Sequence, residues 1–218
     1  MARLKVGVLI SGQGTNLQAL LDACQDPGYP AEIVVVLSNR PGAPGLDRAR
    51  AFGIAAEVVD HKAFGDRPTF EAALDARLRH YAVELVCHAG FMRVLTDYFI
   101  SRWHDRQLNI HPSLLPAFPG LRTHERAIAA GVRFSGCTVH IPRVEVDGGP
   151  IIAQAVVPVL AEDTPETLAA RILACEHKIY PLALRLMAEG RVRVVGDVAY
   201  IDGRAGPPTA LFNPSLER

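Results

Sequence analysis

Short apolar segments alternate with segments of helical character through the first half of the chain, and this alternation constrains the fold more than any other feature. Buried strands are predicted at residues 4–10, 33–37, 55–59, 85–89 and 108–111. Helices are predicted between them at residues 17–23, 46–52, 70–81 and 98–103. Strands joined through helices pair in parallel by right-handed crossovers. We therefore expect an α/β fold, a Rossmann-like and mostly parallel sheet with helices on both faces.

The second half has a different pattern. A helix is predicted at residues 123–130, and strands at 137–141 and 151–157 flank a short turn that allows antiparallel pairing. Thr164-Pro165-Glu166 is a strong helix start, and an apolar stripe then continues to Leu186. Pro181 is predicted to interrupt that helix, because proline removes a backbone donor and clashes with the preceding turn. A final hairpin is predicted from residues 192–195 and 198–201.

No internal repeat, low-complexity block or linker divides the chain. We expect one domain over residues 1–203, followed by a proline-rich and poorly ordered tail at residues 204–218. Ligands of such sheets bind beyond the carboxyl ends of the strands. Three polar or glycine-rich segments fall there: residues 11–16, 90–95 and 109–112.

Composition narrows the classes of function. The 218 residues carry 23 basic and 23 acidic side chains, with a pI near 7.1. This balance argues against a nucleic-acid partner, which usually demands a basic surface. No apolar stretch approaches a membrane span, so no membrane partner is expected. The four cysteines form no CxxC pair, which favours buried free thiols and a reducing, cytoplasmic location. A monomer and a homodimer are equally compatible with the sequence.

Two polar side chains two residues apart mark the end of the fifth predicted strand. Asn109 and His111 lie on the same face of an extended segment, and Pro112 keeps His111 out of the helical region. Asp147 follows in a tight turn before the apolar run at residues 150–157. An amide, an imidazole and a carboxylate together can bind an oxyanion and move a proton. An ordinary strand-end histidine and a turn aspartate fit the same residues.

A glycine-rich turn connects the first predicted strand to its helix. It lacks the third glycine of a dinucleotide fingerprint, so it favours a single phosphate over NAD. A plain tight turn capped by Thr15 or Asn16 is equally compatible.

Ser113 has no nucleophile elbow, which argues against a serine hydrolase. No histidine or cysteine pattern has zinc spacing, so no metal is expected. His88, inside an apolar strand, is interpreted as a core histidine.

Six segments taken together resemble the phosphoribosylglycinamide formyltransferase family, the folate-dependent glycinamide ribonucleotide transformylases of purine synthesis. The segments are Ser11-Gly12-Gln13-Gly14-Thr15-Asn16-Leu17-Gln18-Ala19-Leu20, Ala89-Gly90-Phe91-Met92-Arg93, Asn109-Ile110-His111-Pro112-Ser113-Leu114-Leu115-Pro116, Leu121-Arg122-Thr123-His124, Asp147-Gly148-Gly149-Pro150-Ile151-Ile152 and Glu176-His177-Lys178-Ile179-Tyr180-Pro181. The segment that begins at Ser11 is the narrower match to this branch. The segments that begin at Asn109 and Asp147 resemble folate-linked formyltransferases in general.

The resemblance implies a formyltransferase fold and a role for each matched position. The catalytic trio is Asn109, His111 and Asp147. The ribonucleotide substrate is implied to contact Gly14, Thr15, Asn16 and Glu176. Folate is implied to contact Arg67, Met92, Arg93, Val94, Leu95 and Asn109, and the loop Arg143, Val144, Glu145, Val146 and Asp147. Thr15 replaces a common serine but keeps the hydroxyl, whereas His88 stands where an aliphatic residue is expected.

The implied reaction transfers the formyl group of 10-formyltetrahydrofolate, a cosubstrate, to the glycyl amine of glycinamide ribonucleotide, without a metal or a covalent enzyme intermediate. Asn109 and protonated His111 would hold the tetrahedral oxyanion, with Asp147 favouring the charged imidazole and assisting proton transfer. A cis peptide before Pro116 is also implied. We further expect residues 117–134 to act as a lid over the site.

Three alternatives are distinguishable. A formyltetrahydrofolate hydrolase would need an extra regulatory domain, and a methionyl-tRNA formyltransferase a tRNA-binding domain and a basic surface; we expect neither in this chain. A non-catalytic phosphoribosyl-ligand sensor would need the phosphate loop but not the catalytic trio.

Overall fold

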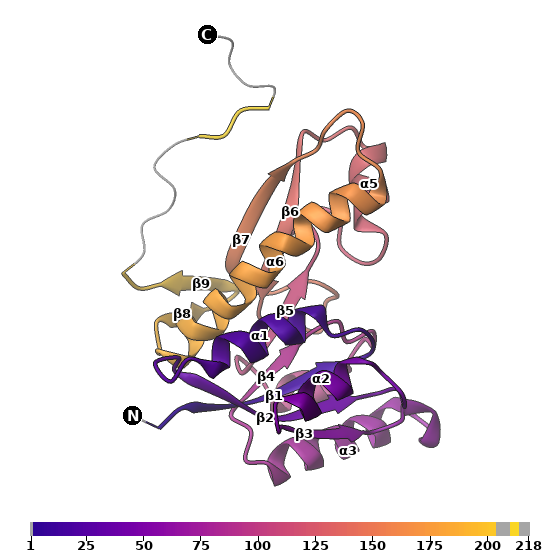
Figure 1. Cartoon of the computed structure of the whole chain (residues 1–218), viewed down its shortest axis with the longest axis vertical. Coiled ribbons are helices and arrows are strands. Elements are labelled where there is room, and N and C mark those ends of the chain that lie inside the picture. The colour runs from indigo at the N-terminus through magenta and orange to yellow at the C-terminus, as the bar shows by residue number, and fades with distance from the viewer. Residues whose placement is uncertain (1, 204–209, 214–218) are drawn as a thin grey trace.

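A computed structural model describes residues 2–203 and 210–213, and its centre is a seven-stranded sheet (Figure 1). The strand order is β3-β2-β1-β4-β5-β6-β7, in which β1 to β5 are parallel and β6 and β7 are antiparallel to their neighbours. The strands are β1 Leu4–Ile10, β2 Ala31–Ser38, β3 Ala55–Val58, β4 Leu85–His88, β5 Gln107–His111, β6 Phe134–His140 and β7 Ile151–Pro158. A separate hairpin pairs β8 (Val192–Val195) with β9 (Val198–Ile201). The predicted parallel sheet, antiparallel pair and hairpin are confirmed.

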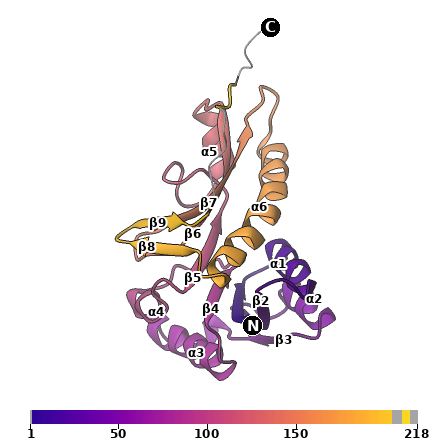
Figure 2. The same cartoon turned by 90° about the vertical axis from the view of Figure 1, so that its left-hand side faces the viewer.

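Helices cover both faces of the sheet, as predicted. They are α1 Thr15–Gln25, α2 Gly45–Ala51, α3 Arg67–His80, α4 Asp97–Arg102, α5 Thr123–Ala129 and α6 Pro165–Ala188, with a 3-10 turn η1 at His61–Ala63. Figure 2 shows α3 and α4 on one side of the sheet and α1, α2 and α6 on the other. Each side has its own apolar core: the first gathers around Phe70, Leu74 and Phe99, and the second around Leu17, Leu20 and Tyr180.

Helix α6 corrects one prediction. It runs without interruption from Pro165 to Ala188 although Pro181 lies inside it, so the predicted interruption is wrong. An internal proline costs a helix about 3 kcal/mol. The apolar stripe on either side of it, including Tyr180 and Leu184, is fully buried against the sheet. The carbonyl of Pro181 also accepts a hydrogen bond from Tyr29 Oη at 2.6 Å. Tertiary packing therefore outweighs the local preference of proline.

Strand β5 joins the parallel half of the sheet to its antiparallel half. Leu108 and Ile110 point into the core beneath α1 and α6. Gln107, Asn109 and His111 alternate with them and face the side of α3 and α4. Asn109 and His111 line a cavity at the carboxyl end of the strand. Gln107 is instead fully buried and donates to the carbonyls of Ile100 and Trp103.

Several smaller predictions have mixed outcomes. All four cysteines are free; Cys24, Cys87 and Cys137 are buried, but Cys175 is only half-buried because it flanks the buried stripe of α6. The tail predicted at 204–218 falls mostly outside the described residues, which omit 204–209 and 214–218. Within the described part of the chain, none of the helices combines the length and apolarity needed to cross a membrane.

Gly136 offers a test of how β6 packs. A Cβ at this position would lie 1.9 Å from the carbonyl oxygen of Ala155 on β7 and 2.9 Å from Leu114 Cδ2. We expect Gly136→Ala to lower the free energy of unfolding by about 2 kcal/mol, because backbone cannot yield as a side chain can. Gly65→Ala is the matched control, since a Cβ there meets nothing within 4 Å, and it should change stability by less than about 0.5 kcal/mol. Denaturant titrations measure both changes, and equal unfolding free energies for Gly136→Ala and Gly65→Ala would contradict this packing.

Candidate active site

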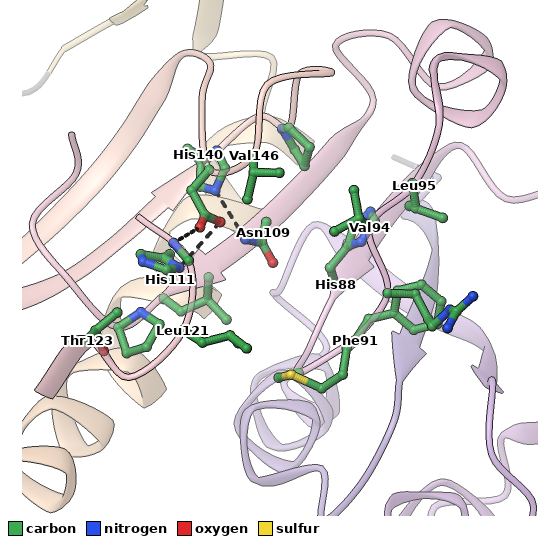
Figure 3. A pocket seen from close by; sticks show the side chains of 18 of the residues that line it. His88, Phe91, Val94, Leu95, Asn109, His111, Leu121, Thr123, His140 and Val146 are labelled. Carbon is green, nitrogen blue, oxygen red and sulfur yellow. Dashed lines mark hydrogen bonds and ion pairs between the residues drawn. The ribbon is translucent and has the colours of Figure 1, made fainter. Parts of the chain in front are cut away.

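A cavity of about 560 Å³ lies at the carboxyl ends of β4 and β5, within the size range of small-molecule sites (Figure 3). It is lined by the segment after β4, the segment after β5 and the loop between β6 and β7. Its lining includes most of the residues expected at the folate and catalytic positions: Met92, Arg93, Val94, Leu95, Asn109, His111, Arg143, Val144, Val146 and Asp147. Five of its apolar side chains are more than half exposed, namely Met92, Val94, Leu121, Val144 and Val146.

His111 and Asp147 face each other inside this cavity. Asp147 Oδ1 lies 3.3 Å from His111 Nδ1, and the two side chains are only 13% and 7% exposed. The other carboxylate oxygen accepts a hydrogen bond from the backbone N–H of Gly120 at 2.7 Å. Asp147 adopts φ 55, a left-handed conformation that aspartate tolerates better than most residues. The turn therefore aims the carboxylate inward at the imidazole.

Both ring nitrogens of His111 face acceptors. Nε2 lies 3.1 Å from the carbonyl oxygen of Phe118, which can only accept, and Nδ1 faces the carboxylate of Asp147. A carbonyl and a carboxylate are satisfied together only when each ring nitrogen carries a proton. A protonated ring would thus donate to both acceptors at once.

Asn109 is oriented by His140, a residue of β6 to which the sequence assigned no definite role. His140 Nδ1 donates to the carbonyl of Gly148 at 3.0 Å, so its Nε2 carries a lone pair. That nitrogen accepts a hydrogen bond from Asn109 Nδ2 at 3.1 Å. Burial lowers the pKa of His140, which keeps the ring neutral and able to accept. The second N–H of the Asn109 amide is left to the cavity.

The segment between β4 and α4 is fixed at both of its ends. Near its start, Ser11 Oγ accepts from the backbone N–H of Met92 at 2.8 Å. At its end, Glu71, a buried residue of α3, accepts from the backbone N–H of Thr96 at 2.8 Å. These two anchors hold the wall formed by residues 92–95.

The segment after β5 turns sharply and returns to His111 and Asp147. Thr138 Oγ1 donates to the carbonyl of Ser113 and accepts from the backbone N–H of Leu115. The Leu115–Pro116 peptide is cis, which confirms the expectation for Pro116. Ser113 Oγ donates to the carbonyl of Ala117 at 2.6 Å, so this hydroxyl serves the turn.

The glycine-rich turn after β1 leads into α1 without a side-chain cap. Gly14 has φ 68, and a Cβ on it would lie 2.9 Å from Gly45 Cα, so glycine is required here by the backbone alone. The buried Asn16 donates from Nδ2 to Glu176 Oε2 at 2.7 Å, joining α1 to α6. Burial raises the pKa of Glu176.

The remaining expected residues lie outside the main cavity lining. Arg67 is the first residue of α3, and Glu145 is the one member of its loop, residues 143–147, that the lining omits. Thr15 lines a separate cavity of about 350 Å³ with Arg48 and His177. In the part of the chain that the structure describes, no group of three or more His, Cys, Asp or Glu side chains is arranged to hold a metal ion.

Comparison with known proteins identifies the family. The model of the formyl transferase family matches residues 4–184. The chain belongs to the formyl transferase family. This confirms the resemblance found from the sequence motifs, and the fold is likewise the α/β formyltransferase fold.

Three relatives illustrate the similarity. A phosphoribosylglycinamide formyltransferase of Haemophilus influenzae is 45% identical over 209 residues, covering 96% of this chain and 99% of that protein. The trifunctional purine biosynthetic protein adenosine-3 of Gallus gallus is 50% identical over 88% of this chain, but the chain spans only 19% of its length. The crystal structure of glycinamide ribonucleotide transformylase 1 from Symbiobacterium toebii is 52% identical, with a TM-score of 0.89 over 91% of this chain and 94% of that one.

His88 lies at this cavity, at a position where the family resemblance leads us to expect an aliphatic residue. It is 5% exposed, lines the cavity and contacts Gln107 Oε1 through Nε2 at 3.1 Å. Burial, the dominant cause, lowers the pKa of His88 to about 4. The interpretation as a core histidine is therefore incomplete, because its ring also forms part of the site.

This pKa predicts how stability depends on pH. Because the pKa of His88 is lower in the folded state than in the unfolded chain, the unfolded chain binds the additional proton as pH falls. The contribution of neutral His88 is complete above the unfolded pKa of about 6.5 and is lost as pH falls towards about 4. We expect wild type to lose about 3 kcal/mol more unfolding free energy than His88→Leu over this interval. If denaturant titrations gave the same pH dependence of the unfolding free energy for wild type and His88→Leu, the lowered pKa of His88 would be contradicted.

Proposed function

We propose that this chain transfers the formyl group of 10-formyltetrahydrofolate to the glycyl amine of glycinamide ribonucleotide, a step of purine synthesis. The observation that carries the proposal is the convergence of Asn109, His111 and Asp147 on one cavity of ligand size. The name of the Haemophilus influenzae relative, which the chain covers almost entirely, supports the same reaction. Folate enters as a substrate that gives up its formyl group.

Asn109 and His111 stabilise the charge that develops on the formyl oxygen. The glycyl amine attacks the formyl carbon, a new carbon–nitrogen bond forms, and the carbonyl oxygen becomes an oxyanion. Asn109 donates its second N–H, since His140 holds the first and fixes the plane of the amide. Removing one such donor typically costs about 3 kcal/mol of transition-state stabilisation.

His111 can donate to the same oxygen only after one of its present contacts is released. The carbonyl of Phe118 now occupies Nε2, and Gly120 contacts Asp147 from the same segment. Both contacts come from residues 117–134, the segment expected to act as a lid. Movement of this segment when substrates bind would free Nε2 while Asp147 keeps its position against Nδ1.

Asp147 supplies the negative charge that keeps His111 protonated and a base for the proton of the amine. The nitrogen of the glycyl amine loses one proton when it becomes the product amide. N10 of the folate gains one proton as its bond to the formyl carbon breaks. Asp147 passes this proton, directly or through water. Ser113 is not used as a nucleophile, because its hydroxyl is committed to the carbonyl of Ala117.

The two substrates approach from different sides of the trio. The phosphate of the ribonucleotide is assigned to Gly14, Thr15 and Asn16, where the first turn of α1 has no side-chain cap. The folate is assigned to the cavity wall at residues 92–95 and to the loop at residues 143–147. The exposed apolar side chains on that wall and loop provide a surface that a flat ring system would cover.

A direct test separates this function from its rivals. The protein is incubated with 10-formyltetrahydrofolate, with and without glycinamide ribonucleotide, and both folate and ribonucleotide products are measured. If the folate loses its formyl group only when the ribonucleotide is present, and formylated ribonucleotide is formed, the result supports the transferase. Equal loss without it indicates a hydrolase, and binding of ribonucleotide without turnover indicates a sensor.

Asp147→Asn tests the catalytic charge. Asparagine is nearly isosteric, tolerates the left-handed conformation and keeps an acceptor for Gly120, so the turn should survive. We expect the melting temperature and both substrate affinities to stay near wild type while kcat falls by about a hundredfold or more. Turnover near the wild-type rate would remove Asp147 from the mechanism.

Combining this change with His111→Ala gives a second readout of the same pair. Groups that act as a unit lose their effect together, so the double variant should be much less impaired than the product of the two single losses. Independent, multiplicative losses would show that His111 and Asp147 do not act as one unit.

Thr15→Val tests the phosphate loop without the distortion that a change at Gly14 would introduce. The hydroxyl of Thr15 makes no hydrogen bond within the described residues, and valine preserves its shape. We expect the Kd for the ribonucleotide to rise about tenfold, the scale of a lost hydrogen bond to a charged group, while the Kd for folate is unchanged. Isothermal titration of both ligands measures this; an unchanged Kd for the ribonucleotide would exclude the hydroxyl from the phosphate site.

A further inference from the structure

His88 belongs to a row of three polar side chains that crosses the sheet. In the register of the strands, His88 of β4 is paired with Asn109 of β5, and Asn109 is paired with His140 of β6. Paired residues of neighbouring strands project from the same face, and adjacent strands lie about 4.8 Å apart. Asn109 is thus flanked by a histidine on each side.

The hydrogen bonds of Gln107 determine which ring nitrogen of His88 carries the proton. Gln107 Nε2 points at the carbonyl oxygens of Ile100 and Trp103, at 3.4 and 3.3 Å, so its Oε1 is the acceptor that faces His88. His88 Nε2 therefore donates to Gln107 Oε1. In the neutral ring the other nitrogen, Nδ1, must carry a lone pair. The lowered pKa of His88 is consistent with a neutral ring near pH 7.

That lone pair has no partner in the described part of the chain, yet it is not sealed inside the protein. Nδ1 takes part in no hydrogen bond there, and it is not one of the fully enclosed polar atoms that lack a partner, which are Asn16 Oδ1, His124 Nε2 and His177 Nε2. His88 lines the main cavity, so Nδ1 meets the space within it. Figure 3 shows the ring beside Val94 and Phe91, across from His111.

A buried acceptor held in one tautomer and directed at a cavity has the properties of a ligand contact. An aliphatic side chain would fill this position without leaving an unpaired polar atom, which carries a penalty when it is desolvated. The surrounding wall is apolar, with Phe91, Val94 and Leu95, so few other groups compete for the lone pair. A ligand that covers this wall and bears an N–H group at its edge would satisfy Nδ1.

We propose that His88 Nδ1 accepts a hydrogen bond from one N–H group of the pterin head of the folate substrate, and so makes His88 a specificity-determining residue. This rests on the proposed function. The pterin head is flat and carries donors at N3, N5, N8 and its exocyclic amine. The formyl group on N10 of the same molecule must reach Asn109, which is the neighbour of His88 across the sheet. A pterin ring bound against Phe91 and Val94 could donate an N–H to His88 Nδ1 and still leave the formyl group within reach of Asn109.

The test combines protein variants with folate analogues. Tetrahydrofolate is compared with four analogues, the 3-deaza, 5-deaza, 8-deaza and 2-desamino compounds, each of which lacks one donor. With wild type, one analogue should bind about tenfold more weakly than tetrahydrofolate, the scale of one hydrogen bond. With His88→Leu that difference should vanish, because the acceptor is gone. His80→Leu, the same change at an exposed histidine outside the cavity lining, should reproduce the wild-type pattern.

The outcomes separate this inference from the function on which it rests. If each analogue has the same Kd relative to tetrahydrofolate in wild type and His88→Leu, the contact is refuted while the transferase proposal stands. If wild type does not bind tetrahydrofolate at all, the proposed function itself is wrong. The ribonucleotide Kd of His88→Leu should stay at the wild-type value, which shows that the variant is folded.

A measurement on the wild-type protein gives an independent answer if His88→Leu does not fold. The nitrogen chemical shifts of the histidine rings report which nitrogen carries the proton and whether the other accepts a hydrogen bond. Without ligand, Nδ1 of His88 should have the shift of an unprotonated nitrogen, and saturating tetrahydrofolate should move it towards the protonated value. A protonated Nδ1 in the free protein, or no change on binding, would overturn the proposal.

Discussion

The alternation of side chains along β5 is the constraint on which the rest of the site depends. Three polar residues of this strand share one face, and each has a different partner: Gln107 holds His88, Asn109 is held by His140, and His111 faces Asp147. The residues between them, Leu108 and Ile110, anchor the strand in the opposite core. A shift of one residue in register would exchange the two sets and bury the polar groups. The packing of the apolar set therefore fixes the chemistry of the polar set.

Much of this arrangement was predictable because it is local. The strand and helix alternation, the common face of Asn109 and His111, and the gathering of segments at the carboxyl ends of the strands follow from periodicity and topology. The partners of these residues were not predictable in the same way. His140 meets Asn109 only through antiparallel pairing between β5 and β6, and its tautomer depends on the carbonyl of Gly148. The misplaced break at Pro181 has a similar origin, since packing along α6 outweighs a local preference.

The turn after β1 has a structural requirement of its own, apart from the phosphate site proposed there. Gly14 is required because its backbone is left-handed and lies against Gly45. In the proposed function, the start of α1, which has no side-chain cap, receives the phosphate. Asn16 of α1 reaches Glu176, which is 160 residues away along the chain. The sequence indicated a phosphate loop and a distant carboxylate separately, but only the fold connects them.

Three histidines lie close to the amide of Asn109, and their hydrogen bonds differ. His88 and His140 each donate one N–H to a neutral oxygen and are buried, conditions that favour a neutral ring with one lone pair. His111 instead faces two acceptors, a carboxylate and a carbonyl. In the proposed mechanism, a single imidazolium at His111 among neutral neighbours concentrates positive charge where the oxyanion forms. A second imidazolium beside Asn109 would raise the energy of that cation by repulsion, so the burial of His88 and His140 agrees with the role proposed for His111.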